Sequence, residues 1–234
     1  SFAVPPDVQS ELALRAIRAG KHVFLEKPIT TSLAKADALV TAAEERGIAS
    51  VTFFTPLFDL RMRAIVEDVA GERQWSGAHG VWLGSALRED NPFNTPWRRL
   101  ANGGLWDLGP HAVAVLWATL GPITSVAADS GGGDLVHLAF HHEGGASSTT
   151  SLTLSASPQA DGFSTELWGE PGRIQLPVDD VDDDAAMALA LHELAENIAT
   201  GRTTHPCDIR FGREVVRVLE SASHELDRSA EARR

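Results

Sequence analysis

The sequence predicts an α/β unit with a doubly wound parallel sheet, followed by an α+β domain with a large, mainly antiparallel open sheet and flanking helices. Two observations carry this prediction. The first fifty residues alternate apolar strands with amphipathic helices, an order that produces parallel strands with right-handed crossovers. From residue 123, strands instead follow one another directly. We expect the boundary near Thr55, giving domains at 1–55 and 56–234.

Five elements are expected in the first domain: a strand at 1–4, a helix at 8–19, a strand at 22–25, a helix at 32–46 and a strand at 48–54. The first helix shows apolar residues every three or four positions and ends at Gly20. The strand "HVFL" that follows shows no alternation, as expected when helices cover both faces of a sheet.

The second domain is expected to open with a helix at 57–70 and a strand within 77–87, followed by a loop and a helix that ends at Gly121. Five strands and two helices then complete it: strands at 123–129, 134–142, 146–156, 163–169 and 173–177, and helices containing 187–198 and 211–226. Val136, Leu138 and Phe140 alternate with polar or small residues, which predicts antiparallel pairing with one covered face. The three glycines at 131–133 are typical of a hairpin turn.

Composition limits the function classes. The formal net charge of −12 and the dispersed arginines disfavour a nucleic-acid partner, and no apolar run is long enough to cross a bilayer. A single cysteine, Cys207, cannot form an internal disulfide, which suits a reducing compartment. We therefore expect a cytoplasmic protein with a small-molecule partner and neither a nucleic-acid nor a membrane partner.

Lys27 is the first candidate for chemistry. It is one of only three lysines in the chain, and it stands in "GKHVFLEKPIT" where an apolar strand ends at Glu26, Lys27 and Pro28. Pro28 removes a backbone donor and biases Lys27 toward an extended conformation. In open parallel sheets, ligands bind at the carboxyl ends of the strands. Lys27 could polarise a substrate oxygen there, or form a surface ion pair with Glu26.

The segment "GGLWDLGPH" supplies the second candidate. Asp107 and His111 are four residues apart, so in a helix they would share a face, and a carboxylate beside an imidazole can hold a general base in one tautomer. Gly103 and Gly104 would allow close approach of another backbone or a flat ligand. The alternative is a capping aspartate beside a packed histidine.

Other groupings are weaker. Asp107 and His111 could bind zinc, but no third ligand lies at a diagnostic spacing, so no metal site is expected. The acidic run 179–184 lacks the glycine and the glutamate of a Ca²⁺ loop, and we interpret it as a solvated loop leading into a helix. Trp97, Arg98 and Arg99 could bind a ring and a phosphate, or could pack domains together.

These motifs together resemble the Gfo/Idh/MocA family of NAD(P)-dependent oxidoreductases. The carrying segments are "PPDVQSELALRAIRAGKHVFLEKPIT", the "WR" at 97–98 and "GGLWDLGPH", in family order across nearly the whole chain. The resemblance implies that Lys27, Asp107 and His111 form the catalytic group, with Lys27 by the reacting hydroxyl, His111 exchanging its proton and Asp107 supporting His111. The hydride would pass between the substrate and a nicotinamide.

The resemblance also implies a site for NAD or NADP. Six residues would contribute to it: Pro5, Pro6, Glu26, Lys27, Trp97 and Arg98. Family members begin with a strand, "GxGxxG" and a helix, and nothing here corresponds to that segment. The sequence is therefore expected to hold the C-terminal part of a Rossmann domain, starting at its fourth strand. This fragment is expected neither to bind the cofactor tightly nor to turn over.

Three hypotheses for the function remain open. The first is an oxidoreductase acting on a secondary alcohol or ketone of a sugar, an inositol or a related cyclic compound. The second is a non-catalytic ligand-binding or regulatory relative with the same fold. The third is a metal-dependent hydrolase that uses Asp107 and His111. The resemblance further implies a homo-oligomer that pairs through the open sheet face.

Overall fold

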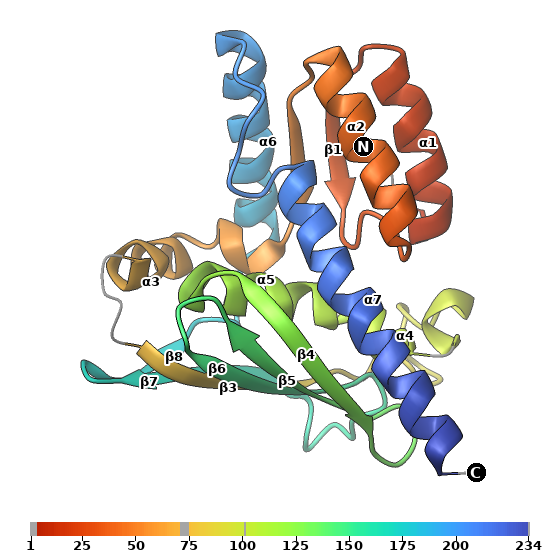
Figure 1. Cartoon of the computed structure of the whole chain (residues 1–234), viewed down its shortest axis with the longest axis vertical. Helices are drawn as coiled ribbons and strands as arrows, with labels where there is room; N and C mark the ends of the chain where they lie inside the picture. Colours follow the sequence, from red (N-terminus) through yellow and green to blue (C-terminus); the bar gives the residue numbers. More distant parts are fainter. Residues whose placement is uncertain (1–3, 71–74, 101, 234) are drawn as a thin grey trace.

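The first unit of the molecule is a short parallel sheet with helices beside it (Figure 1). A computed structural model describes residues 4–70, 75–100 and 102–233. The unit contains four elements: α1 (Pro6–Arg18), β1 (Val23–Glu26), α2 (Leu33–Arg46) and β2 (Ser50–Phe53). β1 and β2 pair in parallel, with Val23 opposite Ser50 and Glu26 opposite Phe53. This confirms the predicted α/β order, while the strand expected at 1–4 falls mostly on residues outside the described ranges.

The second unit is a six-stranded mixed sheet. Its strands are β3 (Trp75–Leu83), β4 (Ile123–Ser130), β5 (Val136–His142), β6 (Ser147–Thr153), β7 (Gly162–Gly169) and β8 (Gly172–Leu176). They lie in the order β4-β5-β6-β3-β7-β8, and only the β3–β6 pair is parallel. The mainly antiparallel sheet is thus confirmed, and residues 131–135 connect β4 to β5 as the predicted hairpin.

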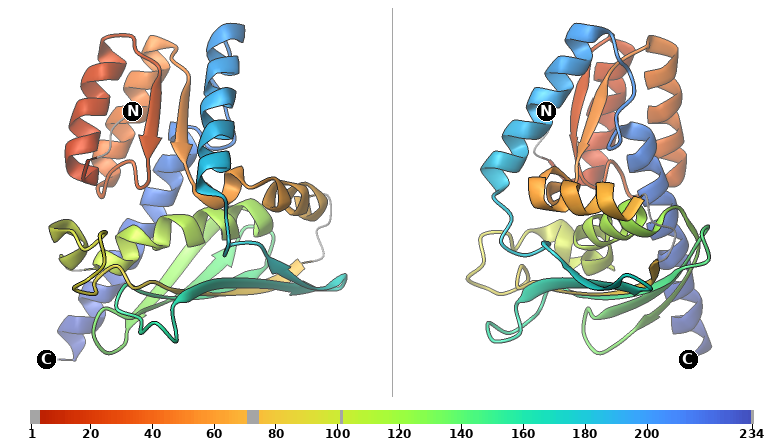
Figure 2. Two further views of the ribbon diagram at one scale, coloured as in Figure 1. Left: turned by 180° about the vertical axis from the view of Figure 1, so that it is seen from behind. Right: turned by 90° about the vertical axis from the view of Figure 1, so that its left-hand side faces the viewer.

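Helices cover one face of this sheet. The helical elements of the second unit are η1 (Thr55–Phe58), α3 (Leu60–Ala70), η2 (Pro96–Arg99), α4 (Gly103–Asp107), α5 (Gly109–Leu120), α6 (Asp183–Thr200) and α7 (Ile209–Ala232). Figure 2 shows α5 between the sheet and the first unit. Buried and exposed residues alternate strictly along β5, so the sheet's other face is open to solvent.

The C-terminal helices connect the two units. The 24-residue α7 contacts α2 and β2 near its start and β4 further along, and α6 contacts β2 (Figure 1). Because α6 and α7 follow the sheet in sequence but pack on the first unit, the division at 55/56 stays a prediction. Within the described residues, no helix is both long and apolar enough to cross a membrane.

Two helices bury different faces from those that their apolar patterns indicate. In α1, the polar Gln9 is buried (1% exposed) whereas Val8 is 46% exposed. In α6, the buried face consists of Ala186, Ala190, Leu194 and Asn197. Leu191 and Ile198 are 46% and 42% exposed.

The N-cap of α7 allows a test of how the start of this helix stabilises the fold. The buried Asp208 carboxylate accepts hydrogen bonds from the backbone nitrogens of Arg210 (2.8 Å) and Phe211 (3.3 Å). Loss of such a cap costs about 0.5–2 kcal/mol. We expect Asp208→Ala to lower the free energy of unfolding by roughly that amount in urea titrations, and Asp208→Asn to retain most of it. Equal stability of Asp208→Ala and the wild type would contradict this account of α7.

Candidate active site

Lys27 stands at the end of β1 and is held by Asp107 from the second unit. Its Nζ donates to the backbone oxygen of Asp107 at 2.7 Å and to Oδ1 at 2.9 Å. Both side chains are largely buried, 14% and 8% exposed. The surface ion pair with Glu26 considered above is therefore not the arrangement found, because Lys27 forms a partly buried contact between the two units. The Lys27–Pro28 peptide bond is cis.

Asp107 is shared with a second cation. Arg98 Nε donates to Oδ2 at 2.7 Å, and its terminal nitrogen donates to Oδ1 at 3.2 Å. Burial alone would raise the pKa of the Asp107 carboxyl, but the charge of Lys27 and the hydrogen bond and charge of Arg98 outweigh it and hold that pKa well below its usual range. Asp107 is thus ionised, and it fixes Lys27 in place.

Arg98 is oriented by the loop before α4. It donates to the carbonyl oxygen of Phe93 at 3.0 Å and to Oγ1 of Thr95 at 3.1 Å, and its guanidinium lies 4.7 Å from the centre of the Trp97 ring. All of these contacts lie within the second unit, so domain packing by Trp97 and Arg98 stays a prediction. A contact of either residue with a cofactor stays a prediction.

Gly103 makes this arrangement possible. A Cβ at Gly103 would lie 1.9 Å from the carbonyl oxygen of Arg98, so only glycine lets α4 begin against that backbone. This agrees with the close backbone approach expected at Gly103, whereas a Cβ at Gly104 would lie in ordinary contact, 3.5 Å from the carbonyl oxygen of Asp134. Asp107 is then the last residue of α4, and the separate helix α5 starts at Gly109 with Pro110 in its first turn.

His111 is not joined to Asp107. Among the described residues no hydrogen bond connects the two side chains, and the buried Nδ1 of His111 has no partner. Burial is the main cause that holds the His111 pKa well below 6.5, with the Lys27 charge adding to it and the Asp107 charge opposing it. His111 is therefore neutral near pH 7 and can accept a proton. The direct support of His111 by Asp107 that the spacing suggested is replaced by an indirect link through Lys27.

An aromatic stack positions the His111 ring. The Trp82 indole lies parallel to it, with ring centres 6.3 Å apart, and Phe163 packs on Trp82 at 5.2 Å. Trp82 Nε1 donates to Thr165 Oγ1 at 3.2 Å, which fixes the indole. Sequence reasoning missed Trp82 and Phe163, although both lie on strands expected to face the helices.

Lys27, His111 and the aromatic stack meet at one cavity of about 600 Å³, whereas Asp107, Trp97 and Arg98 do not line it. Residues from the carboxyl ends of both parallel strands line it, namely Glu26, Lys27, Phe53, Thr55 and Pro56, together with His111, Trp82, Phe163 and residues 178–181, 183 and 184. Burial raises the pKa of the Glu26 carboxyl despite the opposing charge of Lys27. Pro5 and Pro6 do not line this cavity; Pro5 precedes α1 and Pro6 is its first residue. Their role in cofactor binding stays a prediction.

Gln9 holds the end of β1. Its side-chain amide donates to the carbonyl oxygens of Glu26 (2.7 Å) and Pro28 (3.2 Å) and accepts from the Glu26 nitrogen at 2.9 Å. This buried clamp satisfies the backbone where the strand stops. The helical pattern of α1 does not predict these hydrogen bonds, because Gln9 is one of several polar residues in that helix.

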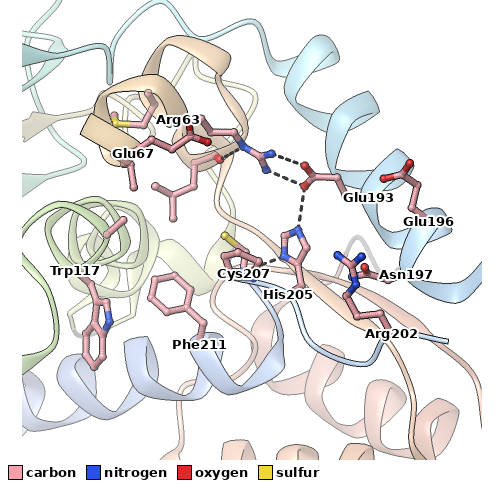
Figure 3. Close-up of a pocket in the computed structure, with 15 residues that line it drawn as sticks. Arg63, Glu67, Trp117, Glu193, Glu196, Asn197, Arg202, His205, Cys207 and Phe211 are labelled. Atoms are coloured by element: carbon pink, nitrogen blue, oxygen red, sulfur yellow. Dashed lines mark hydrogen bonds and ion pairs between the residues drawn. The ribbon is translucent and has the colours of Figure 1, made fainter. Parts of the chain in front are cut away.

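A second cavity of about 600 Å³ lies between α3, α5, α6 and α7 (Figure 3). Glu193 pairs with Arg63 on one side and with Nε2 of His205 (2.9 Å) on the other. Cys207 also lines it, but burial raises the pKa of its thiol to about 12, so it is a poor nucleophile. None of the predicted site residues lines this cavity.

Two family models match the chain. Residues 1–53 match the NAD-binding Rossmann fold of an oxidoreductase family, and residues 76–175 match the GFO/IDH/MocA C-terminal domain. The chain belongs to the Gfo/Idh/MocA family. Its first segment is thus part of an NAD-binding Rossmann domain.

Similar proteins agree with this assignment. A dTDP-3,4-didehydro-2,6-dideoxy-α-D-glucose 3-reductase from Actinomadura kijaniata is 38% identical over 73 residues, 30% of this chain and 22% of its own. The scyllo-inositol 2-dehydrogenase (NADP⁺) IolW of Bacillus subtilis is 28% identical over 115 residues, 47% of this chain and 31% of its own. The aligned segments thus span about a third or less of these curated relatives.

Solved structures share the fold. GenD2 from gentamicin A biosynthesis, in complex with NAD, superposes with a TM-score of 0.81 at 19% identity, covering 99% of this chain and 76% of that one. At this identity the likeness concerns the fold alone. It confirms the predicted combination of a Rossmann-type unit with a large, mostly antiparallel sheet.

The charge cluster predicts an acid-dependent stability. Because the folded-state pKa of Asp107 lies below 3.8, its ion pairs stabilise the fold above that pH and lose this contribution as the pH falls further. Removing one partner of a buried pair costs about 3–5 kcal/mol. We expect Asp107→Asn to unfold at lower urea concentration at pH 7, and the difference from the wild type to shrink below pH 3.8. A pH-independent difference would contradict this assignment.

Proposed function

We propose that this chain contributes the nicotinamide-side half of the active site of an NAD(P)-dependent oxidoreductase that acts on a secondary alcohol or ketone of a cyclic polyhydroxyl compound. The single observation that carries the proposal is the meeting of Lys27 and a neutral, partnerless His111 at one cavity beside the ends of two parallel strands. The sugar and inositol enzymes among the relatives support the substrate class.

The residues present fit one end of the cofactor. Glu26, Lys27 and Phe53 end the two parallel strands and line the cavity, so they would hold the nicotinamide end, which accepts or donates the hydride when bound. A phosphate cradle needs a glycine-rich loop before a helix. In the described residues, the glycines at 131–133 instead connect two antiparallel strands. The described residues therefore fit the nicotinamide end of the cofactor and do not include a phosphate-binding loop of this kind.

The chain's own groups have distinct tasks in alcohol oxidation. His111 accepts the hydroxyl proton, because its depressed pKa keeps it neutral before reaction. Lys27, fixed by Asp107, places a positive charge near the substrate oxygen as negative charge develops there. The C–H bond breaks as the hydride leaves and the carbonyl forms. Asp107 and Arg98 are positioning residues, since they act through Lys27.

Substitution of Lys27 and His111 tests these roles. We expect Lys27→Ala and His111→Ala, each in the longest native chain that contains this sequence, to lower kcat for hydride transfer to NAD or NADP by about 10²–10⁴-fold. Exposed residues elsewhere provide matched controls, Lys35→Ala and His192→Ala, which should retain activity. Rates within a few-fold of the wild type in both active-site variants would refute the role assignment.

The pH profile tests His111 separately. With its pKa held well below 6.5, alcohol oxidation should stay constant as the pH is lowered through 6.5 and fall only at more acidic pH. The measurement is kcat/KM against pH in a constant ionic-strength buffer. An acid limb centred at or above 6.5 would show that another group accepts the proton.

A non-catalytic, ligand-binding role is the alternative. The limited share of the relatives' length that this chain matches motivates it. NADH binding to the native protein without turnover on any sugar or inositol would favour this role over the oxidoreductase.

Pairing of two copies through the open sheet face is a further expectation. Light scattering measures the oligomeric state and tests it.

A further inference from the structure

The cavity at Lys27 has one lining residue whose position the core of the fold does not explain. Phe93, in the loop between β3 and η2, lines this cavity and is 64% exposed. It belongs neither to the buried core nor to the partly buried residues packed against that core. A large apolar side chain left uncovered at a concave site is typical of a residue that a ligand covers on binding.

The loop holds Phe93 in a defined position. Its backbone nitrogen donates to Oδ1 of Asn91 at 2.8 Å, and its carbonyl oxygen accepts from the Thr95 nitrogen at 2.8 Å and from Arg98 at 3.0 Å. Arg98 in turn binds Asp107. Phe93 is therefore attached to the same charge cluster that holds Lys27, and a ligand that binds it does not have to order this backbone.

Packing on Arg98 accounts for only part of the Phe93 side chain. The centre of the guanidinium lies 5.8 Å from the centre of the Phe93 ring and closer, at 4.7 Å, to that of Trp97. Phe93 is 64% exposed with Arg98 in place, so most of its surface is still free for another contact.

A second aromatic surface in the same cavity comes from the sheet. Phe163 on β7 is half-buried and lines the cavity, and it packs on Trp82 with ring centres 5.2 Å apart. Trp82 also stacks on His111, at 6.3 Å. A substrate ring that packs on Phe163 would therefore lie near His111, with Phe93 as a further apolar surface of the same cavity.

We propose that Phe93 binds the carbon face of a cyclic polyhydroxyl substrate and, with Phe163, makes the site prefer rings to open chains. This inference rests on the proposed function and adds a specificity-determining residue to it. In a ring with equatorial hydroxyl groups, the axial C–H bonds form an apolar face that packs on an aromatic side chain, while the hydroxyl groups at the edge stay free for Lys27 and His111. An open-chain polyol has no such fixed face.

Two ring compounds and one open-chain polyol test this inference. The rings are scyllo-inositol and methyl β-D-glucopyranoside, and the open chain is sorbitol, which has as many hydroxyl groups as scyllo-inositol. In the longest native chain that contains this sequence, ligand-observed NMR measures Kd for each compound, and hydride transfer to NAD or NADP measures KM and kcat.

The Phe93 ring carries no group that changes during the reaction, so its loss weakens the ground and transition states alike. We expect Phe93→Ala to raise Kd and KM for the better-bound ring about tenfold, with kcat within about threefold of the wild type. The values for sorbitol should change by less than about twofold.

Matched variants separate the aromatic contact from other effects. Phe93→Trp keeps a flat aromatic face and should bind the ring within about threefold of the wild type, whereas Phe93→Leu keeps only apolar character and should lose most of the preference. Leu60→Ala removes an apolar side chain of similar exposure, 71%, that does not line this cavity, and it should match the wild type.

The outcomes separate this inference from the proposed function. An unchanged Kd for the ring in Phe93→Ala would overturn the inference even in an active oxidoreductase, as would an equal loss for ring and sorbitol or a wild type that binds neither ring. Loss of subunit pairing with unchanged ring binding would assign Phe93 to a protein contact and also overturn it. A Phe93-dependent ring preference in a protein that transfers no hydride would support the inference and refute the oxidoreductase.

Discussion

The ion pair of Lys27 with Asp107 is the interaction on which the candidate site depends. It joins the end of a parallel strand in the first unit to the end of α4 in the second, 80 residues apart in sequence. Two partly buried charges are costly unless their remaining hydrogen-bonding capacity is used. Arg98 completes the set by binding the other carboxylate oxygen. The cluster thus fixes the Lys27 side chain beside the cavity.

The cluster also sets the properties of its neighbours. The nearby Lys27 charge adds to the burial that keeps His111 neutral, while Asp107 limits that effect. Gln9 holds the backbone on either side of Lys27 by donating to the carbonyl oxygens of Glu26 and Pro28. Gln9 thus contacts Glu26 and Pro28, and Asp107 contacts Lys27. The end of β1 is consequently held from α1 and α4, while Arg98 of η2 acts indirectly by binding Asp107.

Much of the fold follows from periodicity. Strands without alternation, glycines after helices and alternating strands in the second unit predict nearly every element, and Lys27 follows from the rule that strand ends of parallel sheets meet ligands. The link between Asp107 and His111 does not follow. A four-residue spacing places side chains together only within one helix, and Leu108 separates α4 from α5.

Other features depend on tertiary contacts that no local pattern encodes. Gln9 lies in an amphipathic helix where polar residues are expected to face solvent, yet β1 offers it three backbone partners. The sequence predicts a solvated loop for the aspartates at 179–184, and only the course of β8 into α6 brings Asp179, Asp180, Asp183 and Asp184 to the cavity. Trp82 looks like an ordinary core residue until His111 is seen stacked on it.

The central claim is that Asp107 acts on Lys27 and not directly on His111. A double-mutant cycle on the free energy of unfolding tests it most directly, using Lys27→Met with Asp107→Asn and, in parallel, His111→Phe with Asp107→Asn. The account predicts a coupling of about 1–3 kcal/mol for the Lys27 cycle and a value near zero for the His111 cycle. The reverse order of the two couplings would contradict it.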